Sequence, residues 1–206
     1  MPSILHSATR PPRTLPVAAL GLTLIELVVV IAVAGILLAV AVPGFRQLVT
    51  ANRLTTAANA IVESLLQARL EAVRRNTTTQ FCSNVATTNG SGALATACGT
   101  AGGAVYVLNA DGTTTLLVSA PQPPPGIVLN SSGTGVVALR YTGQGLARRP
   151  NATVPYTGLV ADLYSTAISR NNRRCIYMTT GSIVSSCAVT STSGCPTNEP
   201  TDCRSQ

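Results

Sequence analysis

An apolar run with one acid near its start, GLTLIELVVVIAVAGILLAVAVP, constrains this chain more than any other feature. The sole charged residue between Leu22 and Val42 is Glu26. A helix of about 20 residues, rising about 1.5 Å per residue, spans the hydrocarbon core of a bilayer. A secretory signal also has a basic head and an apolar core, but here no clean cleavage site follows the core. We therefore predict a retained membrane-spanning helix.

Glu26 is the exception within this run, and two explanations are open. A carboxylate inside a bilayer is costly and is usually paired or functional. Near the start of a helix it can reach the head groups and complement the helix dipole. Alternatively, cleavage after Gly21 would leave a free amine on Leu22, one helical turn away. In a packed bundle, the acid of one subunit could then pair with the amine of a neighbour.

A short motif at the head of the run resembles the class III signal of type IV pilins and type II secretion pseudopilins. The residues that carry this resemblance are Gly21, Leu22, Thr23, Leu24, Ile25, Glu26 and Leu27. The resemblance implies that prepilin peptidase cleaves between Gly21 and Leu22 and methylates the new amine of Leu22. It also implies that Glu26 aids assembly, and that Pro43 kinks the helix near position 43.

The rest of the helix is predicted from periodicity. Between Pro43 and Arg75, apolar residues recur at steps of three and four, which is typical of an amphipathic helix. They are Leu54, Ala58, Ile61, Leu65, Ala68 and Ala72. Glu71 and Arg75 are spaced to form an ion pair across one helical turn. We expect one helix over residues 22–75, of which 22–42 lie in the membrane, after a leader at 1–21.

Beyond the helix, the pattern changes to strands and turns. The short apolar runs lie at 104–109, 114–118, 126–130, 136–141, 158–164, 173–178 and 182–187. Asp111-Gly112 and the Thr179–Gly181 stretch are typical hairpin turns, and the prolines of 121–125 indicate a loop. We therefore expect a β domain over 76–187 and a polar tail over 188–206.

Composition agrees with an exported domain that has a modest core. The chain has 206 residues, a net charge of +7, no tryptophan and 3% aromatic residues. All its basic residues are arginines. These values favour a turn-rich β domain over a large aromatic core.

Six cysteines follow the membrane segment, at positions 82, 98, 175, 187, 195 and 203. An even number in an exported domain indicates disulfides. We expect neighbours in the sequence to pair: Cys82–Cys98, Cys175–Cys187 and Cys195–Cys203. Zinc is the alternative, but the chain has no CxxC pair and its one histidine, His6, lies in the leader. We expect no metal and no cofactor.

The whole layout resembles the minor pilin group that joins FimT and FimU to the pseudopilin GspH. In its closing hairpin the matching residues are Arg173, Arg174, Ile176, Tyr177, Gly181 and Cys187. The resemblance implies an α+β, type IV pilin-like fold, with the long helix packed on an antiparallel β domain. It implies a minor type IV pilin that primes or joins pilus assembly, or alternatively a minor pseudopilin of type II secretion. The implied setting is a single pass through the inner membrane with a periplasmic domain, and the implied partners are prepilin peptidase and other pilins.

DNA binding is a further alternative. A few members of the group bind DNA through a Gly-Arg-x-Arg motif, but here residues 181–184 read Gly-Ser-Ile-Val. The other candidates are Arg148, Arg149, Arg170, Arg173 and Arg174, because arginines bind phosphate. A solvated basic surface or ion pairs with a neighbouring pilin would also explain them. We expect no enzyme, since the chain after the leader lacks histidine and any motif that joins a nucleophile to a base.

Overall fold

The computed structural model describes residues 23–130, 135–201 and 203. The expected cleavage residues, Gly21 and Leu22, lie outside these ranges. The chain divides into two compact units, one up to Val42 and one from Pro43 onward. The helix α1 (Leu24–Arg75) contributes its first half to one unit and its second half to the other.

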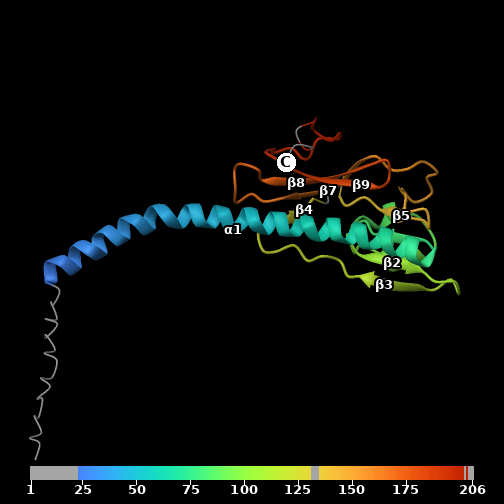
Figure 1. Ribbon diagram of the computed structural model, residues 1–206, viewed down its shortest axis with the longest axis horizontal. Helices are drawn as coiled ribbons and strands as arrows, with labels where there is room; N and C mark the ends of the chain where they lie inside the picture. Colours follow the sequence, from blue (N-terminus) through green and yellow to red (C-terminus); the bar gives the residue numbers. More distant parts are fainter. Residues whose placement is uncertain (1–22, 131–134, 202, 204–206) are drawn as a thin grey trace, which may run out of the picture. The chain divides into compact units, whose positions relative to one another are not determined.

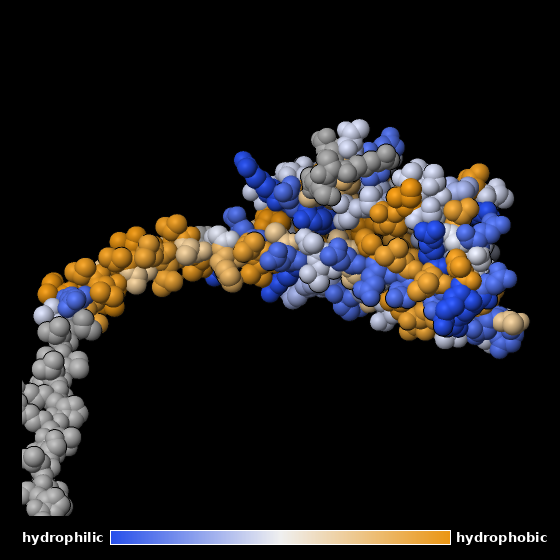
Figure 2. Space-filling view, in the orientation of Figure 1, coloured by the Kyte–Doolittle hydropathy of each residue, from blue (hydrophilic) through white to orange (hydrophobic). Residues whose placement is uncertain are grey.

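The first unit contains the apolar half of α1. Thr23 caps the helix: its hydroxyl accepts the backbone N–H of Glu26 at 3.2 Å, and its carbonyl accepts that of Leu27 at 3.1 Å. All described side chains up to Val42 are exposed in the isolated chain, and Figure 2 shows this half as a continuous apolar surface. By length and composition α1 is able to cross a membrane.

The second half of α1 packs on the β domain. The positions that share the three- and four-residue spacing are all buried: Leu54, Ala58, Ile61, Leu65, Ala68 and Ala72. The helix ends in a Schellman motif, in which Asn76 has a positive φ of 47° and donates to the carbonyl of Val73. The N–H of Thr77 reaches back to the carbonyl of Ala72 at 3.1 Å.

Two antiparallel sheets make up the β domain (Figure 1). The first has the strand order β3-β2-β1-β5-β6 and the second β4-β7-β8-β9. The first sheet contains β1 (Thr79–Phe81), β2 (Val105–Leu108), β3 (Thr114–Val118), β5 (Leu139–Tyr141) and β6 (Ala147–Arg148). The second contains β4 (Val128–Leu129), β7 (Gly158–Tyr164), β8 (Arg173–Thr179) and β9 (Ile183–Val189). The buried face of α1 and the inner residues of both sheets form one main core.

The expected strands and turns are confirmed. Each of the seven apolar runs contains a strand, and hairpins join β2 to β3 and β8 to β9 at the expected turns. Four short elements were not expected: β1, β6, a 3-10 helix η1 (Ala86–Asn89) and a helix α2 (Ala93–Cys98). The last two fill the loop that the Cys82–Cys98 disulfide closes.

Two of the three expected disulfide pairings are wrong. Cys82 does pair with Cys98, but Cys175 pairs with Cys195, and Cys187 with Cys203. Cys175 and Cys187 lie directly opposite each other on β8 and β9, so their side chains share one face of the sheet. The tail folds back over that face, and each cysteine pairs with the tail.

Further contacts hold the tail in place. The Tyr177 hydroxyl donates to the Pro196 carbonyl at 2.7 Å, and Arg173 Nε donates to the Ser191 carbonyl at 2.9 Å. Burial, with added repulsion from the negative charges of Asp162 and Glu199, raises the pKa of Tyr177 to about 12. The described tail residues, 190–201 and Cys203, thus cover the second sheet.

Candidate assembly site

The first turn of α1 presents Glu26 as an exposed acid. Thr23 at the N-cap and Glu26 three residues later match the Thr-x-x-Glu pattern of a capping box, and Thr23 Oγ1 accepts the Glu26 N–H. The carboxylate therefore lies at the positive end of the helix dipole. Residues 23–42 contain no basic side chain. A cationic partner for Glu26 must come from outside this segment.

Pro43 lies within α1, which is helical through this position. Proline lacks the N–H that would bond to the carbonyl of Ala39, so the helix loses one internal hydrogen bond here. The kink expected near Pro43 remains a prediction.

The turn between β8 and β9 requires a glycine at position 181. Gly181 has a φ of 70°, and a Cβ atom at this position would approach the Ala147 carbonyl oxygen to 2.7 Å. Gly181 also exchanges backbone hydrogen bonds with its surroundings: its N–H donates to Tyr156 and its carbonyl accepts from Ala147, both at 2.7 Å. The turn is thereby fastened to β6, and its glycine is structural.

The residues after Gly181 present little positive charge. The Ser182 carbonyl accepts Arg69 Nη1 of α1 at 3.2 Å, and Ile183 is 62% exposed. Where DNA-binding members of the resembled group have arginines, this hairpin offers a hydroxyl and an aliphatic side chain.

Arg173 is not available to a phosphate, so its place among the DNA-binding candidates is wrong. Its side chain is buried, and Nη1 lies 2.7 and 2.8 Å from the two carboxylate oxygens of Asp162. Its guanidinium also stacks on the ring of Tyr164, 4.7 Å from the centroid. The pair lies diagonally across β7 and β8 and holds the start of the tail. Removing one partner of such a buried pair typically costs about 3–5 kcal/mol.

The other four arginines divide between the two ends of β8. Arg170 and Arg174 lie near its start, whereas the β8–β9 turn at its far end contacts β6, which ends at Arg148. A strand of 7 residues such as β8 is about 20 Å long, so these pairs form separate surfaces. Arg170 and Arg149 are exposed, and Arg149 lies 5.2 Å from the ring centroid of Tyr156.

Nothing in the described part of the chain resembles a reaction centre. Those residues contain no group of three or more His, Cys, Asp or Glu side chains that could hold a metal ion. A cleft of about 520 Å³ is lined by the loop after β1, by the tail, and by Val136, Tyr156, Leu159 and Arg149 among others. Its lining contains no acid and no histidine that could serve as a general base.

The family comparison covers the β domain and the helix that packs on it. The model of the family described as type II transport protein GspH matches residues 57–182, from the buried face of α1 to the β8–β9 turn. The chain belongs to the GspH family. The resemblance inferred from the sequence is confirmed, and so is the α+β, pilin-like fold with a long apolar helix. No match was found among curated proteins or solved structures.

Membership of the GspH family establishes a minor pilin or pseudopilin kind of function, in a family whose role is structural. With the apolar first half of α1, it indicates a membrane-anchored subunit that associates with other pilins or pseudopilins. The match begins after Pro43, so the motif around Glu26 is an independent observation. Sequence reasoning missed the N-cap at Thr23, although the Thr-x-x-Glu pattern could have indicated it.

Proposed function

We propose that this chain is a minor type IV pilin that primes or joins pilus assembly after cleavage between Gly21 and Leu22. One observation carries the proposal: Glu26 is exposed in the first turn of α1, and the apolar half of this helix, up to Val42, contains no basic side chain. A lone carboxylate in this position is costly in a bilayer until a cation neutralises it. The amine that cleavage would create on a neighbour's Leu22 has the opposite charge and the right depth.

In this mechanism the precursor waits in the inner membrane with its β domain in the periplasm. Prepilin peptidase cleaves the leader and methylates Leu22, and the helix then leaves the bilayer by packing against other pilins. Glu26 makes its ion pair only in the assembled state. The pair therefore stabilises the filament only when neighbouring subunits are in the correct axial register. The disulfides agree with an oxidising compartment. The protein catalyses no reaction of its own.

A minor pseudopilin of type II secretion is the second candidate. The printed description of the matching family, type II transport protein, favours it. Both candidates use the same helix and the same acid, and they differ in the machine that the subunit enters.

Deletion of the gene separates the candidates. Pili are sheared from the cell surface and quantified against wild type, and exoprotein secretion is measured in the same strains. Loss of pili with normal secretion supports the pilin role, and normal pili with failed secretion supports the pseudopilin role. Complementation with the wild-type chain must restore the lost activity. If both are normal and DNA uptake fails instead, the assembly proposal is overturned in favour of a DNA-binding role.

A further inference from the structure

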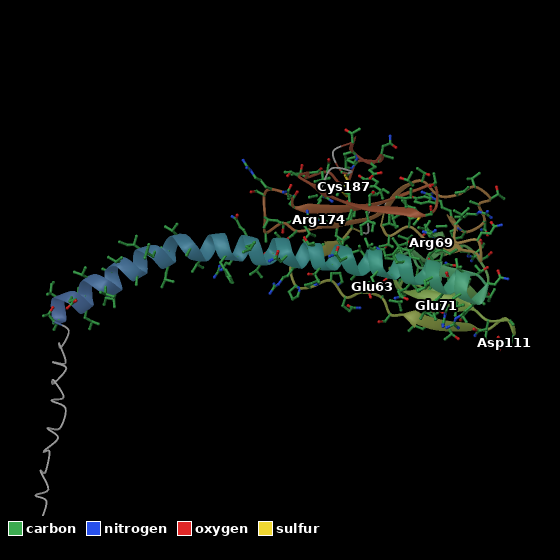
Figure 3. The ribbon with its side chains drawn as sticks, in the orientation of Figure 1. Glu63, Arg69, Glu71, Asp111, Arg174 and Cys187 are labelled. Atoms are coloured by element: carbon green, nitrogen blue, oxygen red, sulfur yellow. A yellow bond between two sulfur atoms is a disulfide. The ribbon has the colours of Figure 1, made fainter. Side chains whose placement is uncertain are left out.

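One end of the β domain brings together three segments, and two of them, α1 and the start of β8, carry arginine. Arg53 of α1 donates through Nη1 to the Pro125 carbonyl at 3.5 Å. Arg174, the second residue of β8, donates through Nη2 to Thr55 Oγ1 of α1 at 3.1 Å. The helix, the loop before β4 and the start of β8 therefore meet at this end, and Figure 3 shows Arg174 directed toward α1.

The loop between β7 and β8 belongs to the same end. Ser165, at the start of this loop, donates its hydroxyl to the Gly126 carbonyl at 2.8 Å. Arg170 is exposed on this loop. Four arginines thus mark this end of the domain, and we refer to them as the arginine collar: Arg46, Arg53, Arg170 and Arg174.

The arginine collar has no acidic counterpart in its own segments. No aspartate or glutamate occurs in residues 43–62, 121–130 or 165–174. Asp162, the acid on the adjoining strand, is buried and engaged by Arg173. The opposite end of α1 is different, because Glu71 there lies 2.9 Å from Arg74 and 2.6 Å from Arg75. Within these described segments the positive charge of the collar therefore has no acidic partner.

Apolar side chains are interspersed with the collar. Phe45 is 67% exposed and Leu48 is 58% exposed on α1, and Val128 at the start of β4 is 45% exposed. Arginines beside exposed aromatic and aliphatic side chains are typical of surfaces that lie at the membrane interface. A solvated basic face or a DNA-binding groove gives no reason for the exposed Phe45 and Leu48.

Connectivity keeps the collar close to a bilayer. The apolar character of α1 continues from Val42 to Val49, interrupted by Gln47 and by the long side chain of Arg46. Arg53 follows Val49 by four residues, which is about 6 Å of helix rise. This distance is comparable with the depth of the head-group layer, about 5–7 Å per leaflet.

We infer that the arginine collar binds the phosphate groups of anionic phospholipids and docks this end of the domain on the membrane surface. The apolar side chains beside it enter the head-group boundary, while the arginines fork onto phosphate. Each arginine near an anionic surface strengthens binding roughly fivefold. The contact holds the subunit before assembly and does not depend on which filament it joins.

Hydrogen exchange of the full chain in nanodiscs tests this inference. Discs of phosphatidylcholine alone are compared with discs that also contain phosphatidylglycerol. We expect the amides of residues 165–172 to exchange about tenfold more slowly in the anionic discs, and we expect high salt to remove the difference. The triple variant Arg53→Gln, Arg170→Gln, Arg174→Gln should also remove it.

A matched triple variant, Arg74→Gln, Arg75→Gln, Arg149→Gln, loses the same charge away from the collar and should keep the slow exchange. Because Arg174 also bonds to Thr55, the double variant Arg53→Gln, Arg170→Gln serves if the collar triple fails to fold. Equal exchange in both kinds of disc overturns the inference. It is also overturned if the matched triple variant loses the slow exchange in anionic discs as fully as the collar triple variant does. Slowing by duplex DNA in phosphatidylcholine discs, without slowing by phosphatidylglycerol, would assign the collar to nucleic acid instead.

Discussion

The two halves of α1 are built from similar apolar residues, yet they bury them in different places. In the first half Ile31 is 60% exposed and Leu37 is 65% exposed, whereas Leu54 and Leu65 in the second half are fully buried. Figure 2 shows the difference as a mainly apolar surface, with hydrophilic atoms near its start, that gives way to mixed colours. The residue types do not explain this difference, but their spacing does.

In the second half, apolar residues occupy one stripe, and polar residues fill the remainder. Small residues on that stripe allow close approach to the sheets: Ala68 is fully buried, and its carbonyl accepts Thr79 Oγ1 at 2.7 Å. The first half is apolar all round, so no single face of a domain could cover it. It requires an apolar solvent on every side, first lipid and then, in the proposed mechanism, neighbouring helices.

The acids of the two halves give the largest expected contrast. We expect Glu26→Ala to lower incorporation into filaments at least about tenfold, since roughly 1.4 kcal/mol of lost pairing suffices for that factor. The matched variant Glu63→Ala removes an exposed acid from the second half and should incorporate normally. Incorporation is measured by immunoblot of sheared filaments against cell-associated protein.

Thermal unfolding of the β domain should be unchanged in both glutamate variants, because neither side chain is buried. Normal incorporation of the Glu26→Ala variant would contradict the proposed pairing with a neighbour's amine. Equal loss in Glu63→Ala would mean that the helix surface as a whole, and not the acid in the first turn, controls assembly.

Truncating a leucine should lower the free energy of unfolding in the second half of α1 but not in the first. Leu65→Ala removes a fully buried side chain from the core and should lower the free energy of unfolding by about 3 kcal/mol. Leu37→Ala, in the exposed first half, should leave it within about 0.5 kcal/mol. Urea titration of the full chain in detergent micelles, with the disulfides intact, measures both values. Similar losses in the two variants would show that the first half also packs on the domain.

The periodic half of α1 was predictable residue by residue, whereas the short strands were not. A stripe at three- and four-residue steps depends only on helix geometry, and all six residues named from it are buried. In contrast, β1 and β6 have 3 and 2 residues, too few for an alternating pattern to appear. They exist because neighbouring strands pair with them.

The disulfides and the arginines show where local reasoning ends. Cys82 and Cys98 close a loop with its own short helices, so their pairing is a local property. The other two disulfides depend on the path of the tail across β8 and β9, which nothing in the tail's sequence reveals. Likewise, Arg173 meets Asp162 only because the register of β7 and β8 makes them diagonal neighbours.

Enlarging a small residue should have a smaller effect than truncating a leucine. Ala68→Leu forces a larger side chain into the contact between α1 and the first sheet, where overpacking typically costs about 1–3 kcal/mol. Ala32→Leu, at an exposed position of the first half, should leave the same urea midpoint unchanged. An unchanged midpoint for Ala68→Leu would show that this contact adjusts easily, and that small residues there are not needed for close approach.

The ion pairs of Glu71 with Arg74 and Arg75, at the end of the second half of α1, should contribute least to the free energy of unfolding. The hydrogen bond from Arg74 lowers the pKa of Glu71 below its ordinary value of 4.5. Burial opposes this effect, and the hydrogen bond from Arg75 and the charges of both arginines add to it. A carboxyl whose pKa is lowered on folding stabilises the protein above its unfolded pKa. That stability is lost as the pH falls from about 4.5 through the folded pKa. Because the arginines are exposed, we expect Glu71→Gln to cost about 0.3–0.5 kcal/mol at neutral pH and nothing in strong acid. If Glu71→Gln still lowers the free energy of unfolding in strong acid, Glu71 stabilises the protein through packing and not through its charge. The end of α1 would then behave like the buried stripe of its second half.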